Sequence, residues 1–244
     1  MKRLFYLVYL TLIALPLFAI VTILCAIFAG IGSAFINERI FSYYPGRIWS
    51  RIALALFLCP IEVRGKENIP KGKSTIVISN HQSSLDIYML YGYMGIPFKW
   101  VLKGALRKVP FVGWACEKSG FIFVDNSSPR AAALTVKQAE EAIRNGYSIF
   151  IFPEGSRTDN GELQRFKRGA FKIAQDTQAT ILPVAIKGAY ESLPKNAIFV
   201  KPRKLILEIG LPFESSVFEQ SPHGLIELTQ RGENEVRTLI EKSV

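Results

Sequence analysis

The chain has 244 residues, of which 49% are hydrophobic and 20% are charged, and its formal net charge is +10. A chain this apolar has ample surface to bury, so intrinsic disorder is excluded. Three widely spaced cysteines and two histidines exclude a disulfide scaffold and a structural zinc site, and we therefore predict no metal.

The N-terminal part is the most apolar region of the sequence. Residues 4–37 form a stretch of 34 residues without one charge. One continuous helix of that length would be about 50 Å long, whereas the hydrocarbon core of a bilayer is about 30 Å thick. We therefore predict a membrane-embedded helical hairpin folded near Pro16, or a span followed by an interfacial helix. A cleaved signal peptide is the third interpretation.

The charges on either side of this stretch favour the hairpin. Lys2 and Arg3 precede it and Arg39 follows it. The positive-inside bias then places both ends in the cytoplasm, at the cytoplasmic (inner) membrane. A second apolar patch, residues 52–61, is too short to span and is typical of an interfacial helix. We predict that residues 1–60 form membrane-associated helices.

In residues 61–244, strand-like and helix-like runs alternate. The expected strands are 61–64, 75–79, 98–102, 121–124, 148–152, 181–186 and 204–209, and the expected helices are 84–94, 129–145, 169–177 and 225–242. Several strands are nearly all apolar, which is typical of strands covered on both faces. The alternation predicts an α/β fold with a mostly parallel central sheet flanked by helices, and residues 211–224 are expected to be a loop.

The first candidate for chemistry follows the strand 75–79. His81 lies in the turn and Asp86 in the first turn of the next helix, at the carboxyl end of a strand, where ligands gather in open α/β sheets. A histidine held by a carboxylate can take a proton from an alcohol and then stabilise its own positive charge. The alternative is structural: Ser83 and Asp86 have the spacing of a helix capping box.

The second candidate follows the strand 148–152. Glu154, Gly155, Ser156 and Arg157 combine a site of close backbone approach, a hydroxyl and a guanidinium suited to phosphate, although a solvated loop has the same composition. Lys167 adds a cation at the start of the next helix.

Taken together, these blocks resemble the glycerolipid acyltransferases, in particular the bacterial 1-acyl-sn-glycerol-3-phosphate acyltransferases. The resemblance rests on NHxxxxD at residues 80–86, FPEGSR at 152–157, FKxGAF at 166–171 and LPV at 182–184. It implies that His81 is the general base, that Asp86 orients it, and that the 154–157 turn binds the phosphate of the acceptor. It also implies substrate-binding roles for Asn80, Lys103 and Lys167.

One position departs from the family pattern. Where family members usually carry an arginine after the strand 121–124 and its aspartate, this chain has Asn126, and Arg130 is a candidate substitute. The departure bears on the phosphate contacts and hence on the acceptor.

The resemblance implies transfer of a fatty acyl group from acyl-carrier protein or coenzyme A to the sn-2 hydroxyl of lysophosphatidic acid, with no cofactor and no acyl-enzyme. Backbone amides around the His81 turn or in adjoining loops are expected to hold the oxyanion. Cys116, in an apolar setting, is expected to be a packed thiol and His223 a surface-loop residue.

The basic character of the chain predicts anionic membrane lipids as partners. Because its cations are scattered and no recognised nucleic-acid motif accompanies them, we predict that the chain has no nucleic-acid partner. Two alternatives remain: an acyltransferase that uses another lysolipid or an amino-lipid, and a non-catalytic lipid-binding membrane protein.

Overall fold

The computed structural model describes residues 2–125 and 127–242. In these residues, eight strands form a sheet with the order β1-β7-β6-β2-β5-β3-β4, and β8 pairs with β6. The strands are β1 (Ile61–Arg64), β2 (Thr75–Ser79), β3 (Phe98–Lys103), β4 (Ile122–Val124), β5 (Ser148–Ile151), β6 (Thr180–Lys187), β7 (Leu205–Ile209) and β8 (Phe213–Glu214). All pairs are parallel except those of β6 with β7 and β8. The mostly parallel sheet predicted from the sequence is confirmed.

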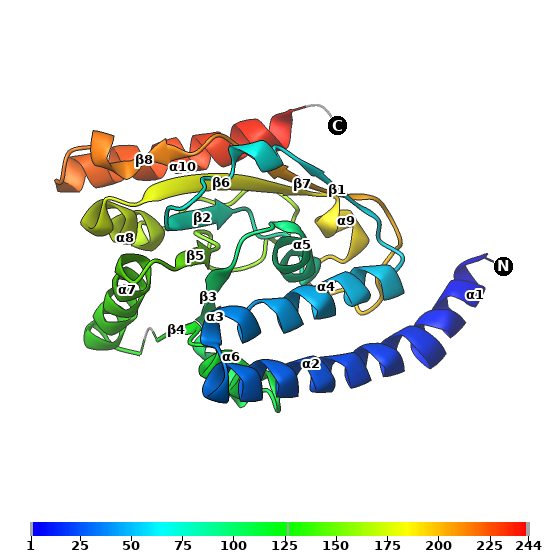
Figure 1. The fold of residues 1–244 in the computed structure, drawn as a ribbon. Coiled ribbons are helices and arrows are strands. Elements are labelled where there is room, and N and C mark those ends of the chain that lie inside the picture. Colours follow the sequence, from blue (N-terminus) through cyan, green and yellow to red (C-terminus); the bar gives the residue numbers. More distant parts are fainter. Residues whose placement is uncertain (1, 126, 243–244) are drawn as a thin grey trace.

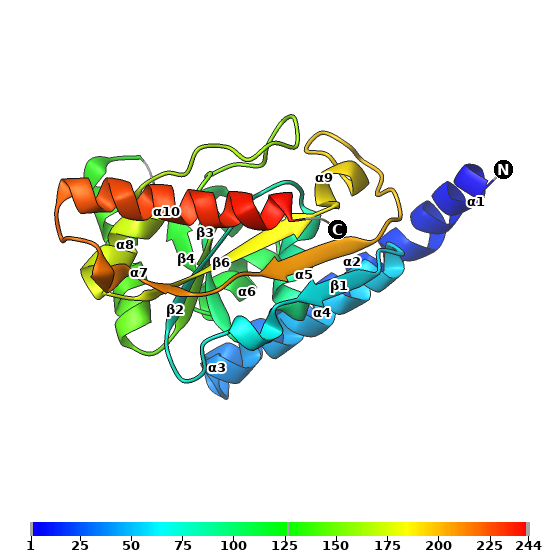
Figure 2. The ribbon, with the colours of Figure 1, turned by 90° about the horizontal axis from the view of Figure 1, so that it is seen from above.

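Helices cover both faces of this sheet (Figures 1 and 2). The α-helices are α1 (Lys2–Tyr9), α2 (Leu15–Phe35), α3 (Glu38–Phe41), α4 (Tyr44–Leu56), α5 (Leu85–Tyr93), α6 (Val112–Lys118), α7 (Pro129–Arg144), α8 (Gly169–Thr177), α9 (Ala189–Ser192) and α10 (Pro222–Glu241). A π-helical segment, η1 (Leu10–Ala14), joins α1 to α2, and 3₁₀ turns form η2 (Lys66–Asn68), η3 (Gly104–Lys108) and η4 (Ser215–Val217). The region expected to be a loop, residues 211–224, therefore contains β8, η4 and the start of α10.

The central strands bury alternate residues against two separate cores. Val77, Phe150 and Leu182 point to the face covered by α5 and α4, whereas Ile76 and Ile149 point to the face covered by α7, α8 and α10. All five are fully buried. This two-sided burial explains why these strands appear in the sequence as continuous apolar runs.

The N-terminal helices differ from the prediction in where the chain turns. Residues 2–35 form one helical rod, so the prediction of a bend near Pro16 is wrong. Pro16 lies in the first turn of α2, directly after η1, where the wider π turn accommodates a residue without an N–H. The chain turns instead at Ile36 and Asn37, and the Asn37 side chain accepts a hydrogen bond from Ile40 N at 3.1 Å to start α3.

After this turn, α4 runs back along α2 and makes the hairpin (Figure 1). The second apolar patch, expected over residues 52–61, is the end of a helix that begins at Tyr44, and its last residue opens β1. Helix α4 packs on α5, so the N-terminal helices share one core with the sheet: Leu10, Leu54 and Met89 are fully buried in it. Residues 4–35 meet the length and hydropathy of a membrane-crossing helix, and only 11% of the most apolar window is buried.

Candidate active site

The two sequence motifs meet because β2 and β5 are adjacent parallel strands. The register pairs Ile78 with Ile151, so both strands end at the same edge of the sheet and release their loops side by side. Two hydrogen bonds of His81 join the loops. His81 N donates to the side-chain Oε1 of Glu154 at 2.6 Å, and Thr158 N donates to His81 O at 2.9 Å. Chemistry-bearing residues some 70 positions apart in the sequence therefore form one site.

His81 and Asp86 are in direct contact. Nδ1 of His81 lies 2.8 Å from Oδ2 of Asp86, and the Asp86 side chain is fully buried. The same oxygen accepts from Gln82 N at 2.6 Å and from Ser83 N at 2.9 Å. A carboxylate oxygen can only accept hydrogen bonds, so the Nδ1 that contacts it carries the hydrogen, and Nε2, which has no hydrogen-bond partner among the described residues, can act as a base.

The contacts of this one carboxylate are compatible with both the catalytic and the capping interpretations of the motif. Asp86 accepts from the backbone of the residues before α5, as a cap does, and it also fixes the imidazole. Its other oxygen, Oδ1, is buried without a hydrogen-bond partner among the described residues. The carboxylate holds the turn and the ring as one rigid unit.

Phe152 fixes the imidazole from its flat side. The two ring centroids are 3.8 Å apart and the rings are nearly parallel, at 11°. The His81 side chain is 16% exposed, so part of the imidazole stays accessible although Phe152 covers one face. Phe152 opens the FPEGSR motif, but its packing on His81 could not be predicted, because the strand pattern marks it only as one more apolar residue.

Glu154 lies beneath the site. Oε1 accepts from His81 N, and Oε2 accepts from Gln164 N at 3.1 Å. Burial raises the pKa of this carboxyl to about 7, and these amide contacts oppose the shift. Both oxygens are thus directed at the backbone, and Glu154 joins the His81 turn to the 153–167 loop.

Asn80 also makes its contacts with the backbone. Its side chain is buried; Nδ2 donates to Ile186 O at 2.9 Å, and Oδ1 accepts from Ile186 N at 2.8 Å. This pair ties the start of the His81 turn to β6. Asn80 and Glu154 were both expected to bind substrate, but the side-chain polar atoms of each form hydrogen bonds with the backbone of this chain.

The predicted phosphate-binding turn presents its cations at the surface. Arg157 is half-buried, and its Nη1 donates to Ser84 Oγ at 2.8 Å, which places the guanidinium beside the residue preceding α5. Gly155 has a φ of +78°, and an added Cβ would lie 2.6 Å from Lys167 Nζ. The ammonium of Lys167 therefore lies over Gly155, while the carbonyl of Ser156 accepts from Gln164 Nε2 at 3.0 Å.

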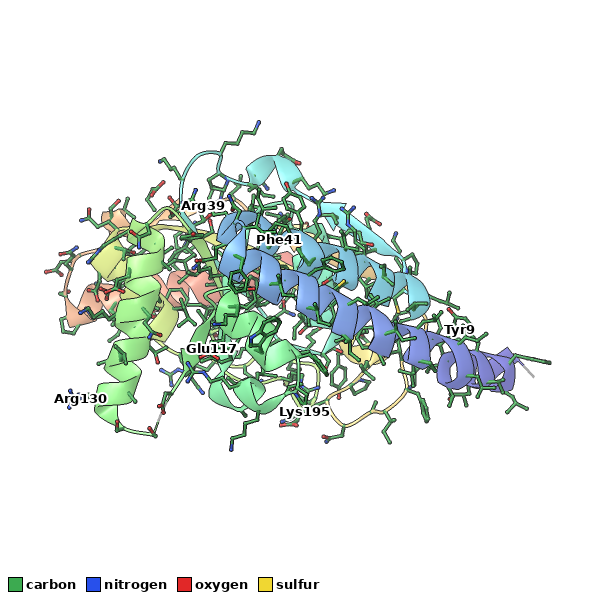
Figure 3. All side chains as sticks on the ribbon, turned by 60° about the horizontal axis from the view of Figure 1, so that its bottom comes forward. Tyr9, Arg39, Phe41, Glu117, Arg130 and Lys195 are labelled. Atoms are coloured by element: carbon green, nitrogen blue, oxygen red, sulfur yellow. The ribbon has the colours of Figure 1, made fainter. Side chains whose placement is uncertain are left out.

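The remaining sequence candidates lie farther out. Lys103 is exposed at the carboxyl end of β3, the same edge as His81 because β3 is parallel to β5. Arg130 is exposed in the first turn of α7, at the margin of the molecule in Figure 3, and Asn126 lies outside the described residues. His223 is exposed as expected, although in the first turn of α10 rather than in a loop.

The surroundings of Cys116 bear on its expected role as a packed thiol. Burial raises the pKa of the Cys116 thiol to about 12, which disfavours the nucleophilic thiolate. Among the described residues, no group of three or more His, Cys, Asp or Glu side chains is placed to hold a metal ion.

The structure narrows the two places that were expected to hold the oxyanion, the His81 turn and the adjoining loops. The N–H groups of His81, Gln82 and Ser83 all donate to the carboxylates of Glu154 and Asp86. They are not available to a developing oxyanion in this arrangement, which leaves the adjoining loops.

A histidine whose Nδ1 is held by a buried carboxylate, beside a loop with arginine and lysine, is an arrangement that can take the proton of a hydroxyl group next to an anionic group. The family comparison agrees with this chemistry. Residues 60–187, more than half of the chain, match the family described as Acyltransferase, and the chain belongs to that family.

Individual relatives extend the comparison. The chain is similar to the chloroplastic 1-acyl-sn-glycerol-3-phosphate acyltransferase of Arabidopsis thaliana, with 34% identity over 64% of this chain and 44% of the relative. It is also similar to the 1-acyl-sn-glycerol-3-phosphate acyltransferase of Pseudomonas aeruginosa, with 35% identity over 70% of this chain and 65% of the relative. In each case the matched region spans less than two thirds of the curated relative.

The likeness to a solved structure covers nearly the whole chain. The crystal structure of the 1-acyl-sn-glycerophosphate (LPA) acyltransferase PlsC from Thermotoga maritima matches with a TM-score of 0.78 and 27% identity, over 99% of this chain and 100% of that one. The resemblance inferred from the sequence motifs is thus confirmed at the level of the family and the fold.

Proposed function

We propose that this protein transfers a fatty acyl group from an acyl thioester to the sn-2 hydroxyl of 1-acyl-glycerol-3-phosphate, giving phosphatidic acid. The observation that carries the proposal is the His81–Asp86 pair, which leaves Nε2 free at a partly exposed position beside Arg157. The names of the bacterial and plant relatives supply the acceptor, lysophosphatidic acid.

The proposed reaction is a direct displacement. Nε2 of His81 takes the proton of the acceptor hydroxyl while the oxygen attacks the thioester carbonyl carbon. Asp86, 2.8 Å from Nδ1, stabilises the imidazolium that forms. When the tetrahedral intermediate collapses, the C–S bond breaks and the imidazolium returns the proton to the sulfur. The products are phosphatidic acid and the free thiol of the donor, and His81 is again neutral.

Arg157 and Lys167 are proposed to bind the acceptor phosphate. The guanidinium is already oriented by Ser84, and the ammonium lies over Gly155, so both cations flank the same turn. A planar guanidinium pairs with two phosphate oxygens at once, whereas an ammonium acts as a point charge. Lys103, at the same edge of the sheet, is proposed to contribute a third cation.

The position of α2 supports membrane association in one leaflet. The helix carries exposed apolar residues along its length, such as Leu17, Leu24 and Phe28, and it packs sideways against α4 and α6. A helix held along the flank of the folded domain cannot cross a bilayer upright while that domain stays in water. We propose that α2 lies in the cytoplasmic leaflet, where an embedded acceptor meets a soluble thioester donor.

The test is a matrix of donors and acceptors with the purified, lipid-reconstituted protein. Acyl-coenzyme A and acyl-carrier protein are each paired with lysophosphatidic acid, a zwitterionic lysophospholipid and an amino-lipid, and thiol release is followed. The proposal predicts release with lysophosphatidic acid well above that with the other acceptors. Preference for another acceptor would reassign the substrate, and no release with any pair would favour a non-catalytic lipid-binding role.

A further inference from the structure

Five consecutive residues, Arg107–Phe111, form an exposed tip that comprises the last two residues of η3 and the three residues between η3 and α6. Every one of them is solvent-exposed, including the apolar side chains of Val109 at 40% and Phe111 at 49%. Trp114, in the first turn of α6, is also 38% exposed. A cluster of large, exposed apolar side chains in one short segment is typical of an interaction surface. We call this segment the 107–111 tip.

The tip stands beside the apolar face of α2. An added Cβ on Gly30 of α2 would lie 2.1 Å from the Trp114 ring, so the indole packs directly on that helix. Ser33 Oγ lies 3.4 Å from Ser119 Oγ at the other end of α6. In Figure 1, α2 and the green segment that holds α6 together form the lower side of the molecule, and Figure 3 shows them side by side from that direction.

The backbone of the tip is held in an unfavourable conformation. Phe111 has φ +60° and ψ −50°, in the region that residues with a side chain rarely adopt. Such strain persists where the surrounding structure enforces it, often at functional sites. Here the packing of α6 on α2 fixes the start of the helix, and the strained residue directs a phenyl ring outward rather than into a core.

The charges of the tip suit an anionic surface. Arg107 and Lys108 are exposed directly before Val109, and the Arg107 guanidinium lies 4.6 Å from the centre of the Phe123 ring, which holds its stem against the domain. Within the described residues, neither cation lies within 4.0 Å of a carboxylate. Cations that flank exposed apolar side chains are typical of segments that lie at a membrane interface.

We propose that the 107–111 tip is a second membrane-contact element, which inserts Val109 and Phe111 at the surface of an anionic bilayer alongside α2. The inference rests on the membrane association proposed above. A single helix fixes the protein to the bilayer but leaves it free to roll about the helix axis. A second contact beside the helix removes that freedom and fixes which side of the domain faces the lipid.

Site-specific fluorescence tests this directly. In the full chain with Cys25→Ala, Cys59→Ala and Cys116→Ala, a single cysteine is introduced as Phe28→Cys, Val109→Cys or Val217→Cys and labelled with an environment-sensitive fluorophore. Val217 is 76% exposed on η4, which directly follows β8, and it serves as the matched control. In Figure 1, β8 lies on the side of the molecule opposite α2. Each protein is bound to phosphatidylcholine–phosphatidylglycerol vesicles with and without brominated acyl chains.

We expect the labels at positions 28 and 109 to shift to the blue and to be quenched by the brominated lipid, and the label at 217 to do neither. Quenching at 28 without quenching at 109 overturns the tip proposal and leaves the membrane association of α2 intact. Absence of quenching at both positions overturns both proposals. Quenching at all three shows general adsorption, which also overturns the tip as a distinct contact.

A second measurement is an activity assay in which the native cysteines are retained and no fluorophore is attached. Val109→Ser with Phe111→Ser is compared with the control pair Leu211→Ser with Val217→Ser, whose residues are also highly exposed. We expect the tip pair to lower transfer to bilayer-embedded lysophosphatidic acid about tenfold, since two half-inserted apolar side chains are lost. Transfer to a dispersed short-chain acceptor stays unchanged. Equal loss on both acceptors, or no loss on either, contradicts the proposal.

Discussion

Asp86→Asn isolates the electrostatic part of the proposed mechanism. The amide oxygen can replace Oδ2 and still accept from His81 Nδ1, Gln82 N and Ser83 N, so the ring keeps its position. What is lost is the negative charge opposite the imidazolium. For ionised partners 2.8 Å apart and an effective dielectric constant of about 20, the attraction is about 6 kcal/mol. This charge matters only once the imidazole has taken the proton.

The expected result is a fall in kcat of about a thousandfold to ten-thousandfold, with the KM of both substrates nearly unchanged. The amide nitrogen would occupy the place of Oδ1, which is buried without a partner among the described residues, so a loss of about 1–3 kcal/mol in unfolding free energy accompanies it. Thiol release is therefore assayed at a temperature where a melting curve shows the variant folded. A loss below tenfold in the folded variant would refute the role assigned to the carboxylate charge.

Three further substitutions probe the groups around the pair. Arg157→Ala should raise the KM of the acceptor far more than that of the thioester in steady-state assays; a larger effect on the donor would assign the turn to the other substrate. Phe152→Leu removes the ring stacked 3.8 Å from that of His81, and kcat should fall roughly two- to tenfold, whereas an unchanged kcat would mean that the stack does not position the base. Glu154→Gln should flatten the dependence of stability on pH. Because burial raises the folded-state pKa of Glu154 from 4.5 to about 7, the folded wild type binds this proton more tightly than the unfolded chain does. Its unfolding free energy therefore falls by about 2 kcal/mol as the pH rises from 5 to 7. If the unfolding free energy fell equally in the wild type and in Glu154→Gln between pH 5 and pH 7, the prediction would be wrong.

The strands were predictable because their signal is local. Strand β2 begins and ends where the sequence predicted, at Thr75 and Ser79, since five residues buried on both faces leave an unbroken apolar run between polar neighbours. The two motifs were also visible as polar clusters after such runs. Their proximity depends on β2 and β5 being neighbours in the sheet, which the sequence pattern alone did not specify.

The errors arose where distant contacts decide the outcome. Pro16 suggested a break, but the π turn of η1 absorbs the missing N–H, and the chain turns at Asn37 instead. Helix α6 was missed because it is short and its stability comes from packing on α2. The backbone contacts of Asn80 and Glu154 were not foreseeable, because the amides that they bind belong to β6 and to the His81 turn, far away in the sequence.

The role of His81 as general base is tested by following free thiol and phosphatidic acid in the same reaction, with lysophosphatidic acid and an acyl thioester, for the wild type and for His81→Ala. We expect the wild type to form the two products in equal amounts and only when the acceptor is present. We expect the variant, folded and bound to vesicles as the wild type is, to form neither. Wild-type-like product formation by His81→Ala, or thiol release by the wild type that does not depend on lysophosphatidic acid, would contradict this assignment.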